Sequence, residues 1–243
     1  MTLFPETLGD VLSESILGRA QERGYIQIET HQIRDYTANK QNQVDDYPYG
    51  GGRGAVMTVD PLYRCWEAVC DQAGGPVHTI YLSPCGHTFR QSDAIRLSKM
   101  ENLVLVCGHY EGIDQRFIDE CVDEEISLGD FVLTGGEIAA MAVTDAVCRM
   151  VPGVLADPEC FEDESHYSGL LEYPQYSRPA VWHGRRVPEI LLSGNHERVA
   201  QWRRKQSLRR TQLRRPDMYE KLDLTSKSDQ KLLREIAEED GEN

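Results

Sequence analysis

Short apolar runs that end in glycine-bearing turns recur through the middle of this chain. Residues 103–107 read Leu-Val-Leu-Val-Cys and stop at a glycine, as expected of a strand buried on both faces of a parallel sheet. Similar runs at 79–82, 126–129 and 131–133 also lead into turns of small residues. Glycine after a buried strand leaves backbone N–H and C=O groups open to a ligand, so we expect one shared pocket at the strand ends. For any single turn, the simpler interpretation is that glycine only makes the turn.

Helical spacing of apolar residues fills the intervals between these runs. Helices are expected over residues 5–20, 60–73, 91–101, 113–121 and 136–151, and further strands over 26–30 and 55–59. Asp60 is expected to cap its helix, with Pro61 at the first helical position. Residues 35–54 are polar and rich in glycine and predict a long loop. The alternation of strands and helices predicts an α/β fold with a mainly parallel sheet.

The last third of the chain loses this alternation. Residues 156–189 show little periodicity and predict a linker or lid, with an acidic run at Glu162-Asp163-Glu164. A solvated loop is the ordinary explanation for such a run. The pattern over residues 195–236 is helical again, and residues 238–243 predict a disordered acidic tail. We therefore expect an α/β domain at 1–155, a linker or lid at 156–189, and a small helical C-terminal domain at 190–243.

Composition narrows the class of protein. The chain has 243 residues, of which 27% are charged and 40% apolar, as in ordinary soluble globular proteins. No apolar run is long enough to span a bilayer, and the opening residues lack the pattern of a signal peptide. The seven cysteines are odd in number and show no C-x-x-C pair, so we expect reduced thiols and a cytoplasmic protein. The seven histidines form no ligand-like cluster, and no structural metal is expected.

The net charge of −14 argues against nucleic-acid binding only as an average over the chain. Residues 198–215 carry arginines and a lysine but no acid. Because distant charges are screened beyond about 10 Å, a local basic face on an acidic protein can still bind phosphates. The alternative is a solvated helix face, but the density of cations around Trp202 favours RNA.

Several segments occur together, in order, over nearly the whole chain. They are Leu3 to Glu6, Val44 to Gly52, Tyr81 to Pro84, Val106 to Asp114, Ser127 to Leu133, Val151 to Leu155, Gly169 to Pro174 and Leu191 to His196. In these segments the sequence resembles the bacterial tRNA (guanine-37-N1)-methyltransferases, a family of trefoil-knotted, SPOUT-class methyltransferases. Several motifs at these spacings are far more specific than any one of them.

The resemblance implies a fold and a set of partners that pattern alone does not give. It implies a deep trefoil knot in the parallel sheet, against the usual rule that chains do not thread loops. It also implies S-adenosylmethionine as the methyl donor and a homodimer with active sites at the subunit interface, where Asp45 to Gly54 would serve the partner's site. The implied substrate is tRNA with guanine at positions 36 and 37. Assistance by Mg²⁺ stays open.

The resemblance assigns the cofactor pocket to the same strand-end turns. The implied residues are Tyr81, Leu82, Ser83, Pro84, Gly86, Gly108, Tyr110, Glu111, Gly112, Ser127, Leu128, Gly129, Asp130, Phe131, Val132, Leu133, Gly135 and Gly136. With a tRNA substrate, the basic helices gain a role in holding phosphates. The residues expected to do so are Arg198, Arg203, Arg204, Lys205, Arg209 and Arg210.

Methylation at guanine N1 needs a base for the N1 proton and a cation for the charge that develops on O6. The family places an arginine at the end of the long helix, which matches Arg149, although this residue could simply complement the helix dipole. The family's aspartate in the linker falls on Glu164, and Asp163 is the family's residue type one place off. Both stay candidates for the base, with Glu164 favoured.

Two positions and the length of the first strand depart from the family pattern. Cys85 stands where glutamine is usual, and Arg53 where a small residue or proline is common. The first strand looks shorter than in the family by about five residues, as if Met1 were an internal methionine.

Two rival functions also remain: methylation of a ribose 2′-hydroxyl on the same fold, and a non-catalytic RNA-binding scaffold. Mapping the methyl group separates the first, and binding of S-adenosylmethionine the second.

Overall fold

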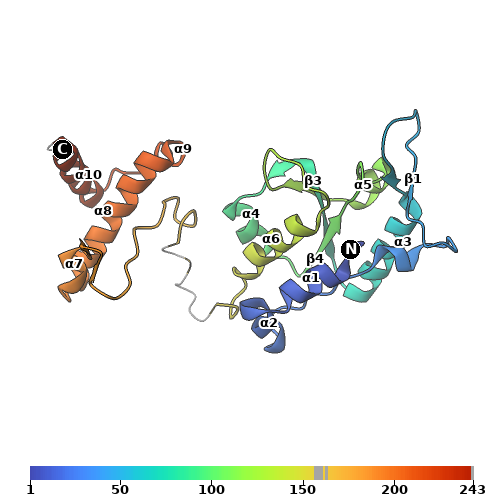
Figure 1. Ribbon diagram of the computed structural model, residues 1–243, viewed down its shortest axis with the longest axis horizontal. Coiled ribbons are helices and arrows are strands. Elements are labelled where there is room, and N and C mark those ends of the chain that lie inside the picture. Colours follow the sequence, from blue (N-terminus) through green and yellow to red (C-terminus); the bar gives the residue numbers. More distant parts are fainter. Residues whose placement is uncertain (156–160, 162–163, 242–243) are drawn as a thin grey trace. The chain divides into compact units, whose positions relative to one another are not determined.

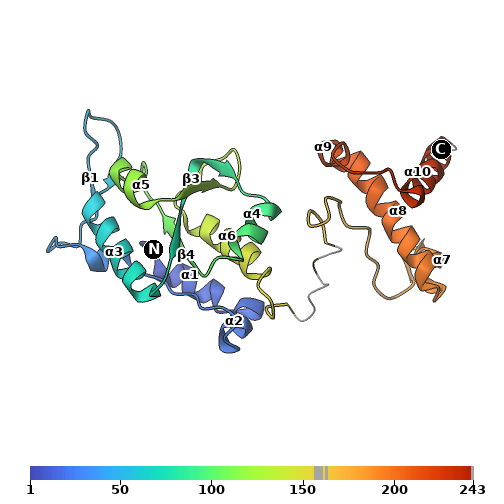
Figure 2. The same cartoon turned by 180° about the vertical axis from the view of Figure 1, so that it is seen from behind.

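The structure is a computed structural model that describes residues 1–155, 161 and 164–241. The chain folds as two compact units, Met1–Asp157 and Pro158–Asn243, which are drawn from opposite sides in Figures 1 and 2. Within the described residues, no helix is both long enough and apolar enough to cross a membrane.

A parallel sheet organises the first unit. The central strand β3 (Val77–Thr88) pairs with β4 (Asn102–Cys107) on one side and β5 (Glu124–Ser127) on the other. Helix α4 (Gln91–Leu97) connects β3 to β4, and α5 (Gln115–Cys121) connects β4 to β5. The prediction of an α/β fold with a parallel sheet is confirmed. The register of β3 on β5 shifts between Leu82 and His87, so β3 bends where the predicted small-residue turn begins.

Helices cover both faces of this sheet (Figure 1). On one face, α3 (Val59–Ala73) and α5 bury Leu62 and Phe117. On the other face, α1 (Pro5–Leu12), α4 and α6 (Glu137–Cys148) pack on Ile80 with Leu97 and Val143. A two-residue pair, β1 (Asp45–Asp46) with β2 (Val56–Met57), and the 3-10 helix η1 (Ile33–Tyr36) complete the unit. This burial on both faces explains why β4 reads as a continuous apolar run.

All five helices expected in the first unit differ from the prediction at one end or both: α4 already ends at Leu97, α5 begins at Gln115, and α6 covers only Glu137–Cys148. The helix expected at 5–20 is two helices, because α1 ends before Ser13 and α2 (Ser15–Glu22) restarts at a residue with φ of +56°. Helix α3 begins one residue early, with Thr58 as its N-cap and Asp60 inside the first turn. Pro61 is therefore the third helical residue, where its missing N–H still costs no helical hydrogen bond.

Two of the expected strands are wrong. Residues 26–30 belong to no strand, because no described strand lies beside them to complete a ladder. The run at 131–133 is not a strand either, and Phe131 and Val132 are 55% and 81% exposed. Apolar character alone predicted burial there, but burial depends on what packs against the loop.

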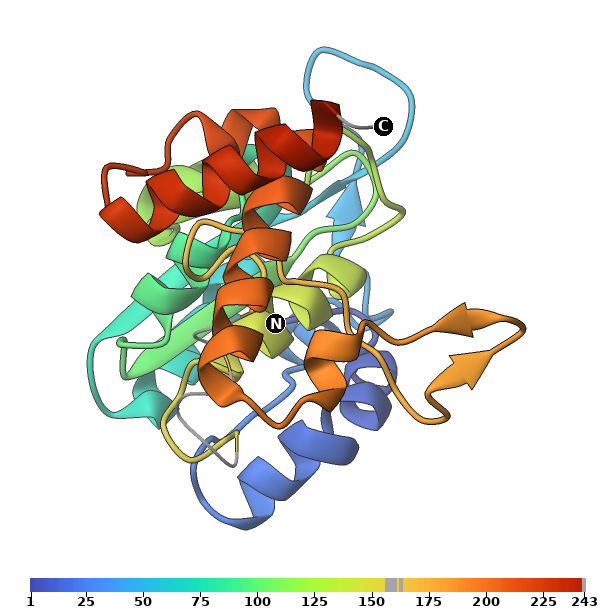
Figure 3. The ribbon, with the colours of Figure 1, turned by 90° about the vertical axis from the view of Figure 1, so that its left-hand side faces the viewer.

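The second unit is helical with one small hairpin. The hairpin pairs β6 (Val181–Trp182) with β7 (Arg185–Arg186), and Figure 3 shows it as two orange arrows extending from α7 and α8. The helices are α7 (Glu189–Leu192), α8 (His196–Arg214), α9 (Pro216–Tyr219) and α10 (Lys227–Gly241). Leu208 of α8 packs with Leu232 and Ile236 of α10 to form the core of this unit. The expected disordered tail is wrong up to residue 241, because α10 continues through it.

Candidate active site

The bend of β3 and the turns after β4 and β5 start at the same edge of the sheet. Leu82 of β3 pairs with both Cys107, the last residue of β4, and Ile126, next to the end of β5, and the register of β3 shifts just after it. In open parallel α/β sheets this edge, at the carboxyl ends of the strands, is the usual place for a ligand. The structure thus brings together the beginnings of the three segments predicted to hold the cofactor.

The turn after β4, residues 108–112, is held from both sides by backbone hydrogen bonds. The N–H of Gly136 donates to the carbonyl of Gly108 at 3.0 Å. On the other side, the N–H of Glu111 donates to Ala55 and the N–H of Met57 donates to Gly112, both at 3.0 Å. Gly112 has a φ of +125°, which only glycine adopts without strain. Main-chain contacts therefore hold the turn on both sides.

Glycine is required at two of these positions because of close approach. A Cβ on Gly136 would lie 2.6 Å from the Cα of Cys107, and one on Gly108 would lie 2.8 Å from the hydroxyl oxygen of Tyr81. Both distances are shorter than any real carbon contact allows. The two glycines let the start of α6, the end of β4 and the ring of Tyr81 pack directly on one another.

The turn after β5 has a self-contained hydrogen-bond pattern. The hydroxyl of Ser127 donates to the carbonyl of Gly129 at 3.0 Å and accepts from the N–H of Gly129 at 3.1 Å. The N–H of Phe89 donates to the carbonyl of Ser127 at 2.8 Å. Ser127 is buried, so its side chain shapes the turn.

The predicted cofactor residues divide by burial. Tyr81, Leu82, Ser83, Ser127 and Gly136 are buried, whereas Pro84, Tyr110, Glu111, Asp130, Phe131 and Val132 are exposed; the others are half-buried. Burial, together with the charges of Glu125 and Cys85, raises the pKa of Tyr81 to about 12, so its hydroxyl stays neutral. This edge of the sheet therefore has neutral hydroxyl groups among its buried residues. Longer side chains, which are exposed to solvent, surround them.

The sequence pattern did not indicate a contact between His109 and the buried Glu137 next to these turns. Nε2 of His109 lies 2.8 Å from Oε2 of Glu137, whose other oxygen accepts from the hydroxyl of Thr2 at 2.6 Å. Glu137 is 6% exposed. The pair ties the β4 turn to the start of α6 and to the N-terminal residues. The only sequence signal is an acid at the head of an otherwise apolar helix.

The candidate catalytic residues lie in different units. Arg149 is the half-buried C-cap of α6, and its N–H donates to the carbonyl of Asp145 at 3.1 Å. Glu164 is half-buried in the second unit, where its N–H donates to the carbonyl of Phe161 at 3.2 Å. Asp163 lies outside the described residues. The pairing of an arginine with a linker carboxylate therefore stays a prediction.

The basic residues of α8 meet acids that the local sequence did not reveal. Arg204 donates two hydrogen bonds to Asp229, at 3.0 and 3.1 Å. Lys205 lies 3.2 Å from Glu235 and 2.7 Å from Glu239. Arg209 pairs with Glu239 at 3.5 Å and also with Asp240. All four acids belong to α10, so this helix neutralises one side of α8.

These pairs shift the proton affinity of both partners. The hydrogen bonds from Arg204 hold the pKa of Asp229 below its usual value, although burial opposes this. Burial acts to lower the pKa of Lys205, but its hydrogen bonds with Glu239 and Glu235 outweigh burial and raise the pKa. The charged forms of both residues are therefore favoured in the folded unit.

The other predicted phosphate-binding residues differ from these. Arg210 donates to the carbonyl of Glu172 at 2.9 Å, and Arg203 stacks over the ring of Tyr173 at 4.8 Å. Arg198 is exposed on the first turn of α8. Over the residues that the structure describes, no group of three histidine, cysteine or acidic side chains could hold a metal ion.

Fold and site define a class first: an α/β protein whose parallel sheet gathers glycine turns at its ligand-binding edge, followed by a helical unit. The comparisons then give the family. The family model described as "tRNA (Guanine-1)-methyltransferase TrmD" matches residues 1–221. The chain belongs to this family and is a methyltransferase.

Curated relatives agree with the family model. The chain is 58% identical over 234 residues to a tRNA (guanine-N(1)-)-methyltransferase of Clostridium perfringens, covering 96% of this chain and 97% of that protein. It is 54% identical over 241 residues to a protein of the same name from Alkaliphilus oremlandii, covering 97% and 96%. A third, from Dehalococcoides mccartyi, is 50% identical over 240 residues, covering 99% and 96%.

Proposed function

We propose that this protein transfers a methyl group from S-adenosylmethionine to N1 of guanine 37 in tRNA. Membership of the family supports the reaction class and the tRNA substrate. The observation that carries the proposal is the meeting of the bend in β3 with the turns after β4 and β5 at one edge of the sheet, where Leu82 pairs with Cys107 and Ile126. The reduced thiols of the described cysteines suit work in the cytoplasm.

The turns suit S-adenosylmethionine because they present main chain rather than side chains. This cofactor, when bound, supplies an electrophilic methyl group on a sulfonium. Gly108 and Gly136 have no room for a Cβ because Tyr81 and Cys107 pack directly against them, so the main chain of the turns is held in a fixed position. We propose that main-chain groups of residues 108–112 and 127–136 hold the cofactor, and that these segments form the trefoil knot implied by the family. The buried, neutral Tyr81 would form the floor.

Guanine N1 becomes a nucleophile only after losing its proton, whose pKa is well above 7. We propose that Glu164, or its neighbour Asp163, accepts this proton. Arg149 would then stabilise the negative charge that spreads to O6, since a guanidinium donates hydrogen bonds to an oxygen without losing its own charge. Removing either group is expected to slow methyl transfer by about 10²–10⁴-fold.

The protein is proposed to act as a homodimer with each active site at the subunit interface. The loop that would serve the partner's site contains Tyr47, which is 83% exposed, and Tyr49, which is fully exposed. Large aromatic side chains of this kind commonly become buried when a partner binds. Cations of α8 would hold the tRNA backbone, and guanine 37 would turn out of the anticodon loop into the pocket, which costs little in a single strand.

A pair of matched substitutions tests the proposal. Glu164→Gln should reduce methylation of a tRNA transcript about 10²–10⁴-fold, while S-adenosylmethionine binds with unchanged affinity by calorimetry. Asp163→Asn is the matched control and should retain activity. If Glu164→Gln is active and Asp163→Asn is not, the base is Asp163; full activity in both variants would contradict a linker carboxylate as base.

Transcripts with adenine at position 37 should not be methylated, and a methyl group mapped to a ribose would contradict the proposed target atom.

A further inference from the structure

The β6–β7 hairpin carries a tryptophan that takes no part in the core of the second unit. Trp182 is 62% exposed, and every residue from 175 to 186 is exposed. The two strands are joined by His183 and Gly184, whose φ angles of +49° and +78° are those of a tight type I′ turn. Figure 3 shows the hairpin extending away from α7 and α8. The indole is therefore held at the tip of a short, defined element and is open to solvent.

The register of the hairpin places an arginine beside this tryptophan. Trp182 pairs directly with Arg185 across the two strands, and Val181 pairs with Arg186. Successive residues of a strand point to opposite faces, and directly opposed residues share a face with their Cβ atoms about 5 Å apart. Trp182 and Arg185 therefore form one face, which we call the Trp182 face, and Val181 and Arg186 form the other. Ala180, the next residue of β6 on the Trp182 face, adds only a methyl group.

The indole ring of Trp182 is accessible to a flat ligand. The ring of His183 lies 4.4 Å from it at an interplanar angle of 84°, so the two rings do not stack. Among the described residues, the cation–π contact is that of Arg203 with Tyr173, and it leaves the indole uncovered. Every nucleobase has a flat face of this kind, and single-stranded nucleic acids bind proteins by stacking bases on exposed aromatic rings.

The positive charge of the hairpin is not neutralised by acids. Residues 173–188 contain three arginines and no acid, in a chain of net charge −14. Over the residues that the structure describes, the side chains of Arg185 and Arg186 form no ion pair and no hydrogen bond. Arg204 and Lys205 of α8, in contrast, pair with acids of α10. Cations available for phosphate therefore lie on the hairpin as well as on α8.

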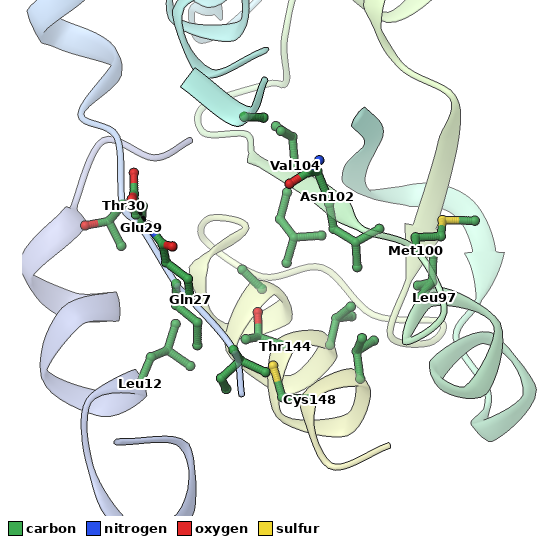
Figure 4. A pocket seen from close by; sticks show the side chains of 18 of the residues that line it. Leu12, Gln27, Glu29, Thr30, Leu97, Met100, Asn102, Val104, Thr144 and Cys148 are labelled. Atoms are coloured by element: carbon green, nitrogen blue, oxygen red, sulfur yellow. Dashed lines mark hydrogen bonds between the residues drawn. The ribbon is translucent and has the colours of Figure 1, made fainter. Parts of the chain in front are cut away.

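The cavity of about 600 Å³ in the first unit has the opposite character. Figure 4 shows its lining, which combines apolar side chains such as Leu12 and Leu97 with the acid Glu29. No arginine or lysine is among the described residues that line it. A phosphate group would find no cation there, so the cavity does not compete with the hairpin as a seat for RNA.

We propose that the Trp182 face is a contact for single-stranded RNA, in which Trp182 stacks on an unpaired base and Arg185 binds a neighbouring phosphate. The inference rests on the proposed tRNA substrate and adds a contact that the basic helix α8 does not include. A stable protein partner would need about 800 Å² on each side of an interface, which two strands of two residues do not supply. Unpaired cations beside an open indole instead match the charge and the flat bases of RNA.

Four single substitutions, measured by filter binding of a tRNA transcript at several salt concentrations, test the two faces against each other. Trp182→Ala should weaken binding about tenfold with an unchanged salt dependence, and Trp182→Phe should restore it to within about threefold. Arg185→Ala should weaken binding about threefold or more and lower the salt dependence by about one phosphate contact. Val181→Ala and Arg186→Ala are the matched controls on the opposite face and should stay within about twofold of the wild type.

Two further measurements separate stacking from loss of structure. All of these side chains are exposed, so each variant should melt within about 2 °C of the wild type. On an RNA duplex of similar length the bases are already stacked on one another. Trp182→Ala should then have no effect on affinity, whereas Arg185→Ala should still weaken binding.

The outcomes that overturn the inference are distinct from those that overturn the proposed function. If the wild type methylates the transcript but Trp182→Ala binds it as tightly, or if both faces give equal losses, the inference alone fails. A wild-type chain that neither binds nor methylates tRNA overturns both. Shielding of Trp182 from acrylamide that grows with protein concentration in the absence of RNA, measured against Trp182→Phe, would assign the face to a second copy and would also overturn the inference.

Discussion

The strand-end turns of the first unit and the basic helix α8 of the second hold their proposed functional groups in opposite ways. At the turns, main chain packs on main chain, and Gly136 lies against the Cα of Cys107 with no space for a Cβ. On α8, the groups are long cationic side chains, and Arg204 and Lys205 form ion pairs with acidic residues of α10. The position of a glycine in the sequence shows directly where two backbone segments can pack closely. Whether a cationic side chain can still bind a ligand depends on acidic residues that lie far away in the sequence.

The largest effect is expected where backbone meets backbone. Gly136→Ala would force a Cβ to within 2.6 Å of the Cα of Cys107, and main chain cannot move aside as a side chain does. We expect a loss of about 1–3 kcal/mol in the free energy of unfolding and no measurable binding of S-adenosylmethionine. Calorimetry and thermal unfolding measure both.

Gly9→Ala is the matched control for that substitution. Gly9 lies in α1 with no atom within 4 Å of the added Cβ, so the variant should be as stable as the wild type or more so by about 0.5–1 kcal/mol. Equal effects of the two substitutions would mean that close packing at the turn is not what requires glycine.

The second effect separates paired from exposed cations. Arg204→Ala would leave the nearly buried Asp229 without its partner and is expected to cost about 1–2 kcal/mol of stability in the second unit. Arg198→Ala should change the free energy of unfolding by less than about 0.5 kcal/mol. It should nevertheless reduce tRNA affinity, and the slope of log affinity against log salt concentration should fall by the equivalent of about one phosphate contact. Filter binding at several salt concentrations, with denaturation of each variant, measures both. If Arg204→Ala weakens tRNA binding without loss of stability, the division between the two classes fails.

The family resemblance and the alternation of strands and helices predicted the parallel sheet correctly, because buried strands and amphipathic helices leave strong local patterns. Residues 26–30 have the same local pattern but form no strand, since a strand requires a neighbour that local sequence does not reveal. The predictions that residues 131–133 are buried and that residues 238–241 are disordered were wrong for the same reason, since both depend on what packs against these segments. Lys205 and Glu239 are distant in sequence, so their pairing had no local signal. The buried pair of His109 with Glu137 likewise joins residues from two elements.

A third prediction concerns the acids of α10 that face Lys205 and Arg209. The double variant Glu239→Gln with Asp240→Asn removes two of these carboxylates and should increase tRNA affinity about two- to fivefold at low salt. The gain should vanish at high salt because phosphate contacts are screened. Unchanged affinity at every salt concentration would show that these cations do not face the tRNA.

The smallest effect is the pH dependence of the second unit. The folded-state pKa of Asp229 is lowered by Arg204, so the stability it contributes is present above its unfolded pKa of about 3.9. That contribution is lost as the pH falls through the lower, folded pKa. Asp229→Asn should therefore flatten the fall in stability below about pH 4, seen as amide exchange at Leu208. A fall of unchanged steepness would assign the acid sensitivity to other carboxylates.

Hydrogen exchange with and without S-adenosylmethionine tests the central claim, that main chain at the strand ends holds the cofactor. The account predicts slowed exchange at residues 108–112 and 127–136 when the cofactor is added, with no change at residues 26–31 or at Leu103 and Leu105 of β4. Protection confined to Leu103, Leu105 and residues 26–31, with the turns unchanged, would contradict it.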